Sequence, residues 1–240
     1  MAQQRRVGAE TSETRAALLD STERLMLDEG YAAVTYRRVA AAANVTAPLV
    51  QYYFPTLDDL FLALLRRRSD RNLQKLTDSL EAHPDTPLRV IWEYSADETS
   101  SALLIEFMAL GNHRKTIRAE IAETSERSRK VQLDALAATR KNRAGSNDDI
   151  ADAALLFLMA GIPKVMLMES DLGVSTGHTE TLDLITRYLN WTEPAQPSKQ
   201  SRKAVKRSTP AKRTSASNSR GKKQTPATRR APARSKSERS

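Results

Sequence analysis

The chain lacks cysteine altogether, and this absence excludes several kinds of chemistry. Without thiols there can be no disulfide, zinc ribbon, iron–sulfur cluster or thiolate nucleophile. The three histidines, His83, His113 and His178, are too scattered along the sequence to predict a metal site. We therefore expect neither a metal nor any other cofactor, and a cysteine-free chain suits a reducing cytoplasm.

Long hydrophobic runs are also lacking. The longest uncharged apolar stretch, residues 153–163, is far shorter than the roughly 20 residues that cross a bilayer as a helix. No charged segment followed by an apolar one comes after Met1, so the sequence does not predict a secretory leader. We expect a cytoplasmic protein without a membrane partner.

Acidic residues are nearly absent from the end of the chain. Residues 195–240 contain 15 Lys and Arg but one acid, Glu238, which gives +14, so the total of +9 leaves −5 for residues 1–194. This segment has no aromatic residue, and Val205 is its one branched aliphatic residue. It cannot bury enough apolar area to offset the entropy of ordering. We expect residues 194–240 to form a disordered basic tail, and residues 1–10 a disordered arm.

Strand-like alternation of polar and apolar residues is missing between residues 44 and 145, whereas helical spacing recurs along the body. The sequence predicts an all-α fold. It has an N-terminal three-helix helix-turn-helix domain (residues 11–56) and a larger helical domain for effector binding and dimerisation (residues 57–193). The expected helices cover residues 11–29, 35–43, 46–54, 57–80, 87–94, 100–110, 115–141, 148–169 and 180–190.

Residues 34–54, VTYRRVAAAANVTAPLVQYYF, predict two short helices joined by a tight turn. Thr35 and Thr46 stand at positions suited to helix N-caps, and Pro48 falls in a first helical turn, where a missing N–H costs little. Asn44 tolerates the left-handed conformation that the turn requires. Two short helices braced by a preceding one are typical of a helix-turn-helix, whose second helix enters the major groove of DNA.

The spacing also predicts which side chains meet DNA. Val50, Tyr53 and Phe54 share the inward face of the second short helix, although the Tyr53 hydroxyl can still reach a phosphate. Small residues at the start of that helix permit close approach, and Gln51 can bond a base edge. Residues at the start of the first short helix would meet the backbone. The predicted contacts with double-stranded DNA are Thr35, Tyr36, Arg37, Thr46, Ala47, Pro48, Leu49, Gln51, Tyr52 and Tyr53.

Residues 14–61 resemble the DNA-binding domain of the TetR (tetracycline repressor) family of bacterial transcriptional regulators. The matching run is DEGYAAVTYRRVAAAANVTAPLVQYYFPTLDDLF, which agrees with the family at many positions without a gap. Three positions depart from the common pattern: Asn44 replaces a glycine, Gln51 a tyrosine, and Leu57 a lysine that touches phosphate. Thr56, at the same helix start, could supply that phosphate contact instead.

The resemblance implies a homodimer whose last two helices form the interface, and a ligand cavity in the second domain. Residues 148–169 agree with this, because they are apolar on nearly every side. One stripe would face a partner subunit and the other the domain's own core; a helix buried within a monomer is the alternative. The predicted interface residues are Phe157, Leu158, Gly161, Val165, Leu182, Ile185 and Leu189.

The effector is predicted mainly from the resemblance, which implies a small apolar or amphipathic compound. Large apolar residues and one histidine lie on the helices that line the cavity in this family, and methionine suits adaptable apolar pockets. Most residues of these types are simply part of the core, which is the alternative for each of them. The candidate contacts are Trp92, Phe107, Met108, His113, Met159 and Met166.

No constellation of a nucleophile with an acid or base predicts an enzyme, and the acid pairs Asp58-Asp59 and Asp148-Asp149 suit first helical turns. We expect a ligand-released repressor that binds a palindromic operator as a dimer in the bacterial cytoplasm. The alternative is an architectural, nucleoid-associated protein whose basic tail coats DNA with little sequence preference. In a third interpretation the tail only promotes solubility.

Overall fold

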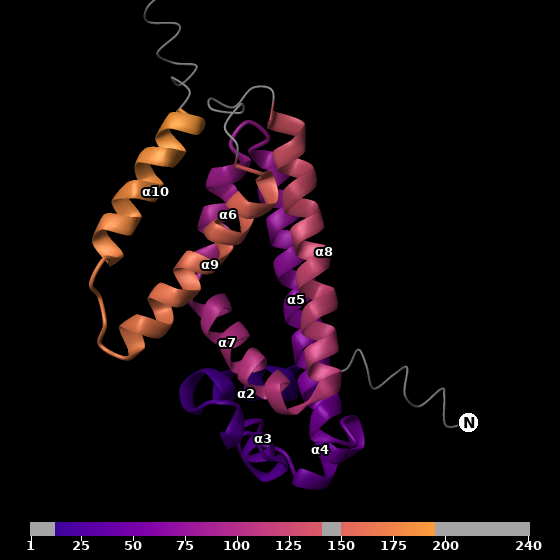
Figure 1. Cartoon of the computed structure of the whole chain (residues 1–240). Coiled ribbons are helices and arrows are strands. Elements are labelled where there is room, and N and C mark those ends of the chain that lie inside the picture. Colours follow the sequence, from indigo (N-terminus) through magenta and orange to yellow (C-terminus); the bar gives the residue numbers. More distant parts are fainter. Residues whose placement is uncertain (1–12, 141–149, 195–240) are drawn as a thin grey trace, which may run out of the picture. The chain divides into compact units, whose positions relative to one another are not determined.

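The computed structural model describes residues 13–140 and 150–194, which form helices with no strand among them (Figure 1). The predicted all-α class is therefore confirmed, whereas the predicted arm and most of the tail lie outside the described residues. The described residues up to Pro194 belong to one compact unit. Its elements are α2 (Glu13–Glu29), η1 (Tyr31–Ala33), α3 (Tyr36–Ala42), α4 (Ala47–Tyr53), α5 (Leu57–Ala82), α6 (Pro87–Ser95), α7 (Glu98–His113), α8 (Lys115–Thr139), α9 (Asp152–Asp171) and α10 (His178–Thr192).

Helices α3 and α4 begin and end where local chemistry requires. The Thr35 hydroxyl accepts a hydrogen bond from the backbone N–H of Arg38, which caps α3. Asn44, in the turn, has φ +55°, the left-handed conformation predicted for it. Thr46 occupies the N-cap position of α4 but its side chain makes no capping hydrogen bond, so only the position of that predicted cap is confirmed.

A first hydrophobic core joins the helix-turn-helix to the helices that follow it. Val39, Val50 and Phe54 pack in one cluster with Phe61 of α5 and Phe107 of α7. The predicted domain boundary at residue 56 therefore separates chain segments but not cores. We expect a displacement of α5 or α7 to shift α3 and α4, because close-packed interiors transmit displacement.

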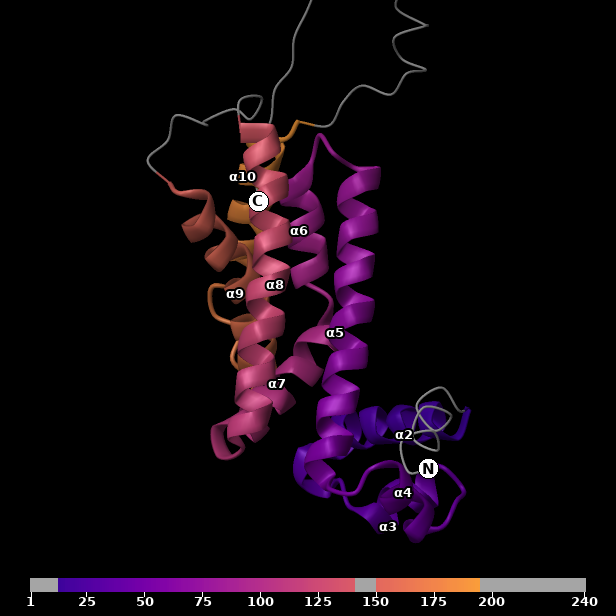
Figure 2. The ribbon, with the colours of Figure 1, turned by 90° about the vertical axis from the view of Figure 1, so that its right-hand side faces the viewer.

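A second core lies between the far halves of α5 and α8 and the helices α6, α9 and α10. Long helices α5 and α8 run side by side in both views (Figures 1 and 2), in agreement with their contacts. The end of α10 is fixed to α6 by Glu193, whose carboxylate accepts from the backbone N–H groups of Leu88 and Arg89 at 2.8 and 3.0 Å. This buried carboxylate satisfies donors that a helix start leaves free.

Helix α9 has two apolar faces, as its sequence predicts. Leu155, Leu156 and Met159 are buried in the second core, whereas Phe157 and Val165 of the opposite stripe are 66 % and 54 % exposed. Among the described helices α9 alone is long and apolar enough to cross a membrane by length and composition. One face of α9 packs on α6, α7 and α8. A partner helix that covers the other face would explain the apolar composition of α9 without a membrane.

Candidate functional site: a reading helix and a cavity

Helix α4 presents a small exposed surface at one end of the described unit. Pro48, Gln51 and Tyr52 are exposed, Ala47 and Leu49 are partly buried, and Val50 is fully buried. The ring of Tyr52 stands edge-on to that of Tyr53, which is partly buried as its inward position predicts. Thr35, Arg37 and Thr46 are exposed on the same pair of helices. The predicted DNA-contacting residues thus surround one solvent-facing helix start.

Two residues predicted to contact the DNA backbone, Tyr36 and Thr56, form hydrogen bonds within the protein. The Tyr36 hydroxyl donates toward the carbonyl oxygens of Phe54 and Pro55, at 3.2 and 2.9 Å, and so ties α3 to the end of α4. Thr56 forms a capping box with Asp59, in which its N–H and hydroxyl both bond the carboxylate. This geometry disfavours the predicted phosphate contact of Thr56, because the Asp59 carboxylate already occupies its donors and would repel phosphate.

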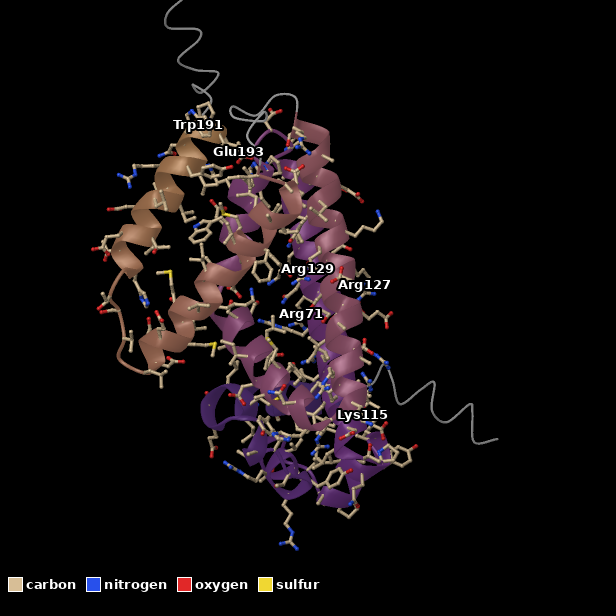
Figure 3. All side chains as sticks on the ribbon, viewed as in Figure 1. Arg71, Lys115, Arg127, Arg129, Trp191 and Glu193 are labelled. Carbon is tan, nitrogen blue, oxygen red and sulfur yellow. The ribbon has the colours of Figure 1, made fainter. Side chains whose placement is uncertain are left out.

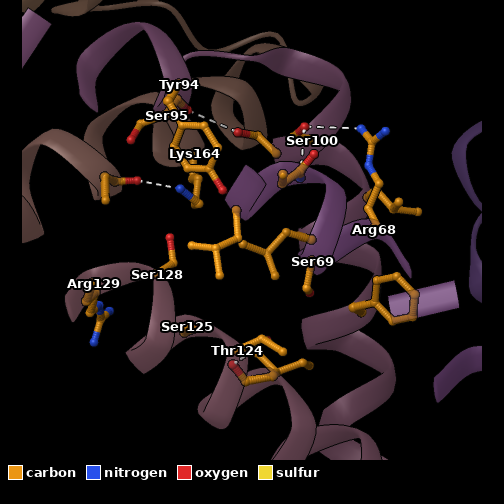
Figure 4. A pocket seen from close by; sticks show the side chains of 18 of the residues that line it. Arg68, Ser69, Tyr94, Ser95, Ser100, Thr124, Ser125, Ser128, Arg129 and Lys164 are labelled. Carbon is orange, nitrogen blue, oxygen red and sulfur yellow. Dashed lines mark hydrogen bonds between the residues drawn. The ribbon is translucent and has the colours of Figure 1, made fainter. Parts of the chain in front are cut away.

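A cavity of about 390 Å³ lies between the two cores, within the size range of small-molecule sites (Figure 4). Helices α5, α6, α7, α8 and α9 all contribute to its wall. Apolar residues such as Leu65, Leu104 and Ile121 share this wall with many hydroxyl groups. The hydroxyl-bearing lining residues are Ser69, Tyr94, Ser95, Ser100, Ser101, Thr124, Ser125 and Ser128.

The structure divides the predicted effector residues into two groups. Phe107 and Met108 line this cavity. Trp92 and Met159 instead pack in the second core, and His113 is exposed at the end of α7, while Met166 is partly buried on α9 away from the lining. Sequence reasoning missed the polar wall, because serine and threonine on long helices carry no signal of their own.

The charges around the cavity have one sign. Arg68, Arg127, Arg129 and Lys164 line it, and no acid is among the described lining residues. Each arginine has a carboxylate partner outside the lining: Arg68 pairs with Glu23, Arg127 with Asp70 and Arg129 with Glu126. Arg127 and Arg129 both project from α8 (Figure 3).

Lys164 of α9 differs from these arginines. Its ammonium group donates to the carbonyl oxygen of Ala160 at 2.6 Å, and no carboxylate pairs with it among the described residues. Burial lowers the pKa of Lys164, and the positive charge of Arg129 lowers it further. A partly buried cation without a paired carboxylate is costly, so Lys164 brings to the cavity wall a charge that no described acid compensates.

The substitution Lys164→Met should therefore stabilise the ligand-free protein, by about 1 kcal/mol at pH 7. Because the folded pKa is depressed, the unfolded chain binds more protons, and this destabilisation by Lys164 fades as pH rises toward the ordinary lysine value of 10.5. Denaturant titrations at pH 7 and pH 10 test both statements: the gain should shrink at pH 10. Lys130→Met, at an exposed lysine paired with Asp134, is the control and should not stabilise. A destabilised Lys164→Met protein would contradict the interpretation.

The residues predicted for the dimer interface also fall into two groups. Phe157, Leu158, Val165 and Leu182 are exposed, and a Cβ added at Gly161 would meet nothing within 4 Å. Two others, however, are 7 % and 3 % exposed because they pack in the chain's own second core; these are Ile185 and Leu189. Helical spacing placed them on one face of α10 correctly but could not decide what that face covers.

Residues 18–64 match the family described as bacterial regulatory proteins, tetR family. This match covers the whole of α3 and α4 and most of α2, the elements that carry the exposed reading surface. A comparison with curated proteins finds no match.

Solved structures of similar fold extend over both halves of the described chain. A TetR-family transcriptional regulator from Rhodococcus sp. has 18 % identity and a TM-score of 0.60, with 74 % of this chain and 100 % of that one covered. A transcriptional regulator from Saccharomonospora viridis in complex with choline has 18 % identity and a TM-score of 0.61, covering 75 % and 95 %. The multidrug-binding protein EbrR, in complex with imidazole, has 24 % identity and a TM-score of 0.52, covering 78 % and 98 %. At these identities the likeness establishes the fold.

Proposed function

We propose that this chain belongs to the TetR family of bacterial regulators and is a ligand-released repressor that binds a palindromic operator as a homodimer. The observation that carries the proposal is the exposed start of α4, where Pro48, Gln51 and Tyr52 stand on a braced helix-turn-helix. In a dimer, two such helices about 34 Å apart would enter successive major grooves.

The exposed stripe of α9 supports the homodimer. Four large apolar side chains are at least half exposed along one face of this helix. A contiguous exposed apolar patch of this kind is typical of an interaction surface. A second copy of the same face would cover them in an isologous contact, the commonest symmetry of soluble dimers. These side chains are Phe157, Leu158, Val165 and Met168.

Contacts between the cavity and the helix-turn-helix support release by a ligand. The Arg68 guanidinium donates to the Ser100 hydroxyl at the cavity wall and pairs with Glu23 of α2. Glu106 of α7 accepts from the backbone N–H of Tyr31 at 2.6 Å. A ligand that displaces α5 or α7 would therefore also displace α2 and η1, the elements that precede the helix-turn-helix pair α3 and α4. By linkage, the ligand must weaken DNA affinity by the same factor that DNA weakens ligand affinity.

The basic tail supports a contribution from non-specific DNA binding. Its net charge of +14 would add affinity that depends on salt and not on sequence. An architectural protein that coats DNA with little preference is the second candidate, and the same tail favours it. The two candidates differ in whether α4 reads bases.

Two substitutions test the reading helix. Gln51→Ala should change the preferred base at one position of each half-site, with a loss of about 1–3 kcal/mol for the original site. Arg37→Ala should weaken all sequences about equally and reduce the salt dependence by roughly one phosphate contact. Fluorescence anisotropy on a panel of single-base operator variants measures both. An unchanged base profile in Gln51→Ala would remove Gln51 from the reading set.

A further inference from the structure

We propose that the effector is an amphipathic carboxylate whose anionic group binds Lys164 while its hydrocarbon chain lies along the apolar wall of the cavity. The proposal deepens the proposed function, on which it rests in treating this cavity as the effector site.

The sign of the ligand charge follows from the residues around the cavity. Four cationic side chains and no described acid line it. A cationic ligand would find no carboxylate in this wall to pair with, and Lys164 would repel it, which makes cations poor candidates.

The place of the anionic group follows from the partners of these cations. Arg68, Arg127 and Arg129 each have a carboxylate within 3.3 Å. Lys164 has only the carbonyl of Ala160, so its ammonium retains donors for a ligand. One uncompensated charge in a partly buried position matches one carboxylate and favours a monoanion over a phosphate dianion.

Neighbouring groups complete a site for the carboxylate. Lys164 reaches the cavity from α9, near Tyr94 and Ser95 of α6, whereas Arg68 enters from the opposite side (Figure 4). The hydroxyls of Tyr94 and Ser128 both line the cavity and bond to each other, which leaves the hydrogen of one of them to donate to a carboxylate oxygen.

The apolar part of the cavity wall suits a hydrocarbon chain. Leu65, Leu103, Leu104, Phe107 and Ile121 line it from α5, α7 and α8. Several of these residues also belong to the first core, beside the helix-turn-helix. A chain lying there would press on the elements whose movement reaches α4, so the apolar part of the ligand supplies the signal and the carboxylate supplies selectivity.

Calorimetric titration of the full chain with three amphiphiles of equal chain length tests the proposal. The probes are decanoate, decan-1-ol and decyltrimethylammonium, all below their micelle concentrations. We expect decanoate to bind at least tenfold more tightly than decan-1-ol, and the cation to bind most weakly. Equal affinity for decanoate and decan-1-ol, preference for the cation, or no binding of decanoate would overturn the proposal.

Variants distinguish binding at Lys164 from non-specific binding of amphiphiles. Lys164→Met should reduce the affinity for decanoate about tenfold and leave decan-1-ol unchanged, which abolishes the preference. Lys164→Gln provides a polar replacement and should give the same loss. Lys130→Met removes an exposed ammonium from α8 and should retain the full preference. A decanoate preference that survives both Lys164 variants would contradict the assignment.

A DNA measurement on the same samples distinguishes failure of this proposal from failure of the proposed function. If the ligand-free chain binds one palindrome selectively but decanoate neither binds nor releases it, the repressor stands and the ligand class is wrong. If decanoate binds at Lys164 but no DNA sequence is preferred, the cavity assignment stands and the repressor is wrong.

Discussion

Val165→Glu should convert the proposed homodimer into a monomer and reduce operator affinity by about 100-fold or more. Val165 lies in the middle of the exposed stripe of α9, 54 % exposed, beside Leu158 and Met168. In a symmetric contact, Val165→Glu brings one carboxylate from each subunit into the same apolar interface, where neither finds a counterion. A single reading head then binds a half-site without the gain that the second head provides.

Sedimentation equilibrium and anisotropy on the operator measure both consequences of Val165→Glu. Ala138→Glu is the matched control, because it adds the same charge to an exposed position of α8, away from the stripe. The control should remain dimeric with full operator affinity. A Val165→Glu protein that sediments as a dimer would show that α9 does not form the interface.

Removal of residues 196–240 should lower DNA affinity by about 10³-fold at 50 mM salt and flatten its salt dependence. The segment carries 15 cationic residues and one acid, so it can neutralise many phosphates and release their counterions. A chain ending at Ala195 retains the buried Glu193 and its hydrogen bonds to α6, so the truncation leaves the α6–α10 contact in place.

Binding measured from 50 to 300 mM salt compares the full chain, the truncated chain and a chain whose tail has the same composition in shuffled order. The shuffled tail should behave like the natural one, because counterion release depends on charge and not on sequence. Identical salt slopes for full and truncated chains would assign the tail a role outside DNA binding.

The helix-turn-helix could be predicted closely from sequence because its determinants are local. The cap at Thr35, the left-handed Asn44 and the inward spacing of Val50 and Phe54 each depend on neighbours within a few residues. The two stripes of α9 were likewise visible, since 3.6-residue periodicity assigns faces to a helix without knowledge of its surroundings.

The cavity could not be predicted because its determinants are distant in sequence. Arg68 meets Glu23 of α2 and Ser100 of α7, and Glu106 meets the N–H of Tyr31, only through the packing of α2, α5 and α7. The short helix η1, which positions Tyr31, carried no recognisable signal. Residue type favoured Trp92 and His113 as effector contacts, whereas the packing placed serines and Lys164 at the cavity wall.

The central claim is that α4 reads a specific DNA sequence, and selection from random duplexes tests it most directly. The full chain and the chain ending at Ala195 should be used side by side at two salt concentrations. We expect both chains to enrich the same palindrome, with weaker overall retention of DNA by the truncated chain. If neither enriches any sequence while the full chain retains every duplex, the protein is an architectural DNA-binding protein and the claim is contradicted.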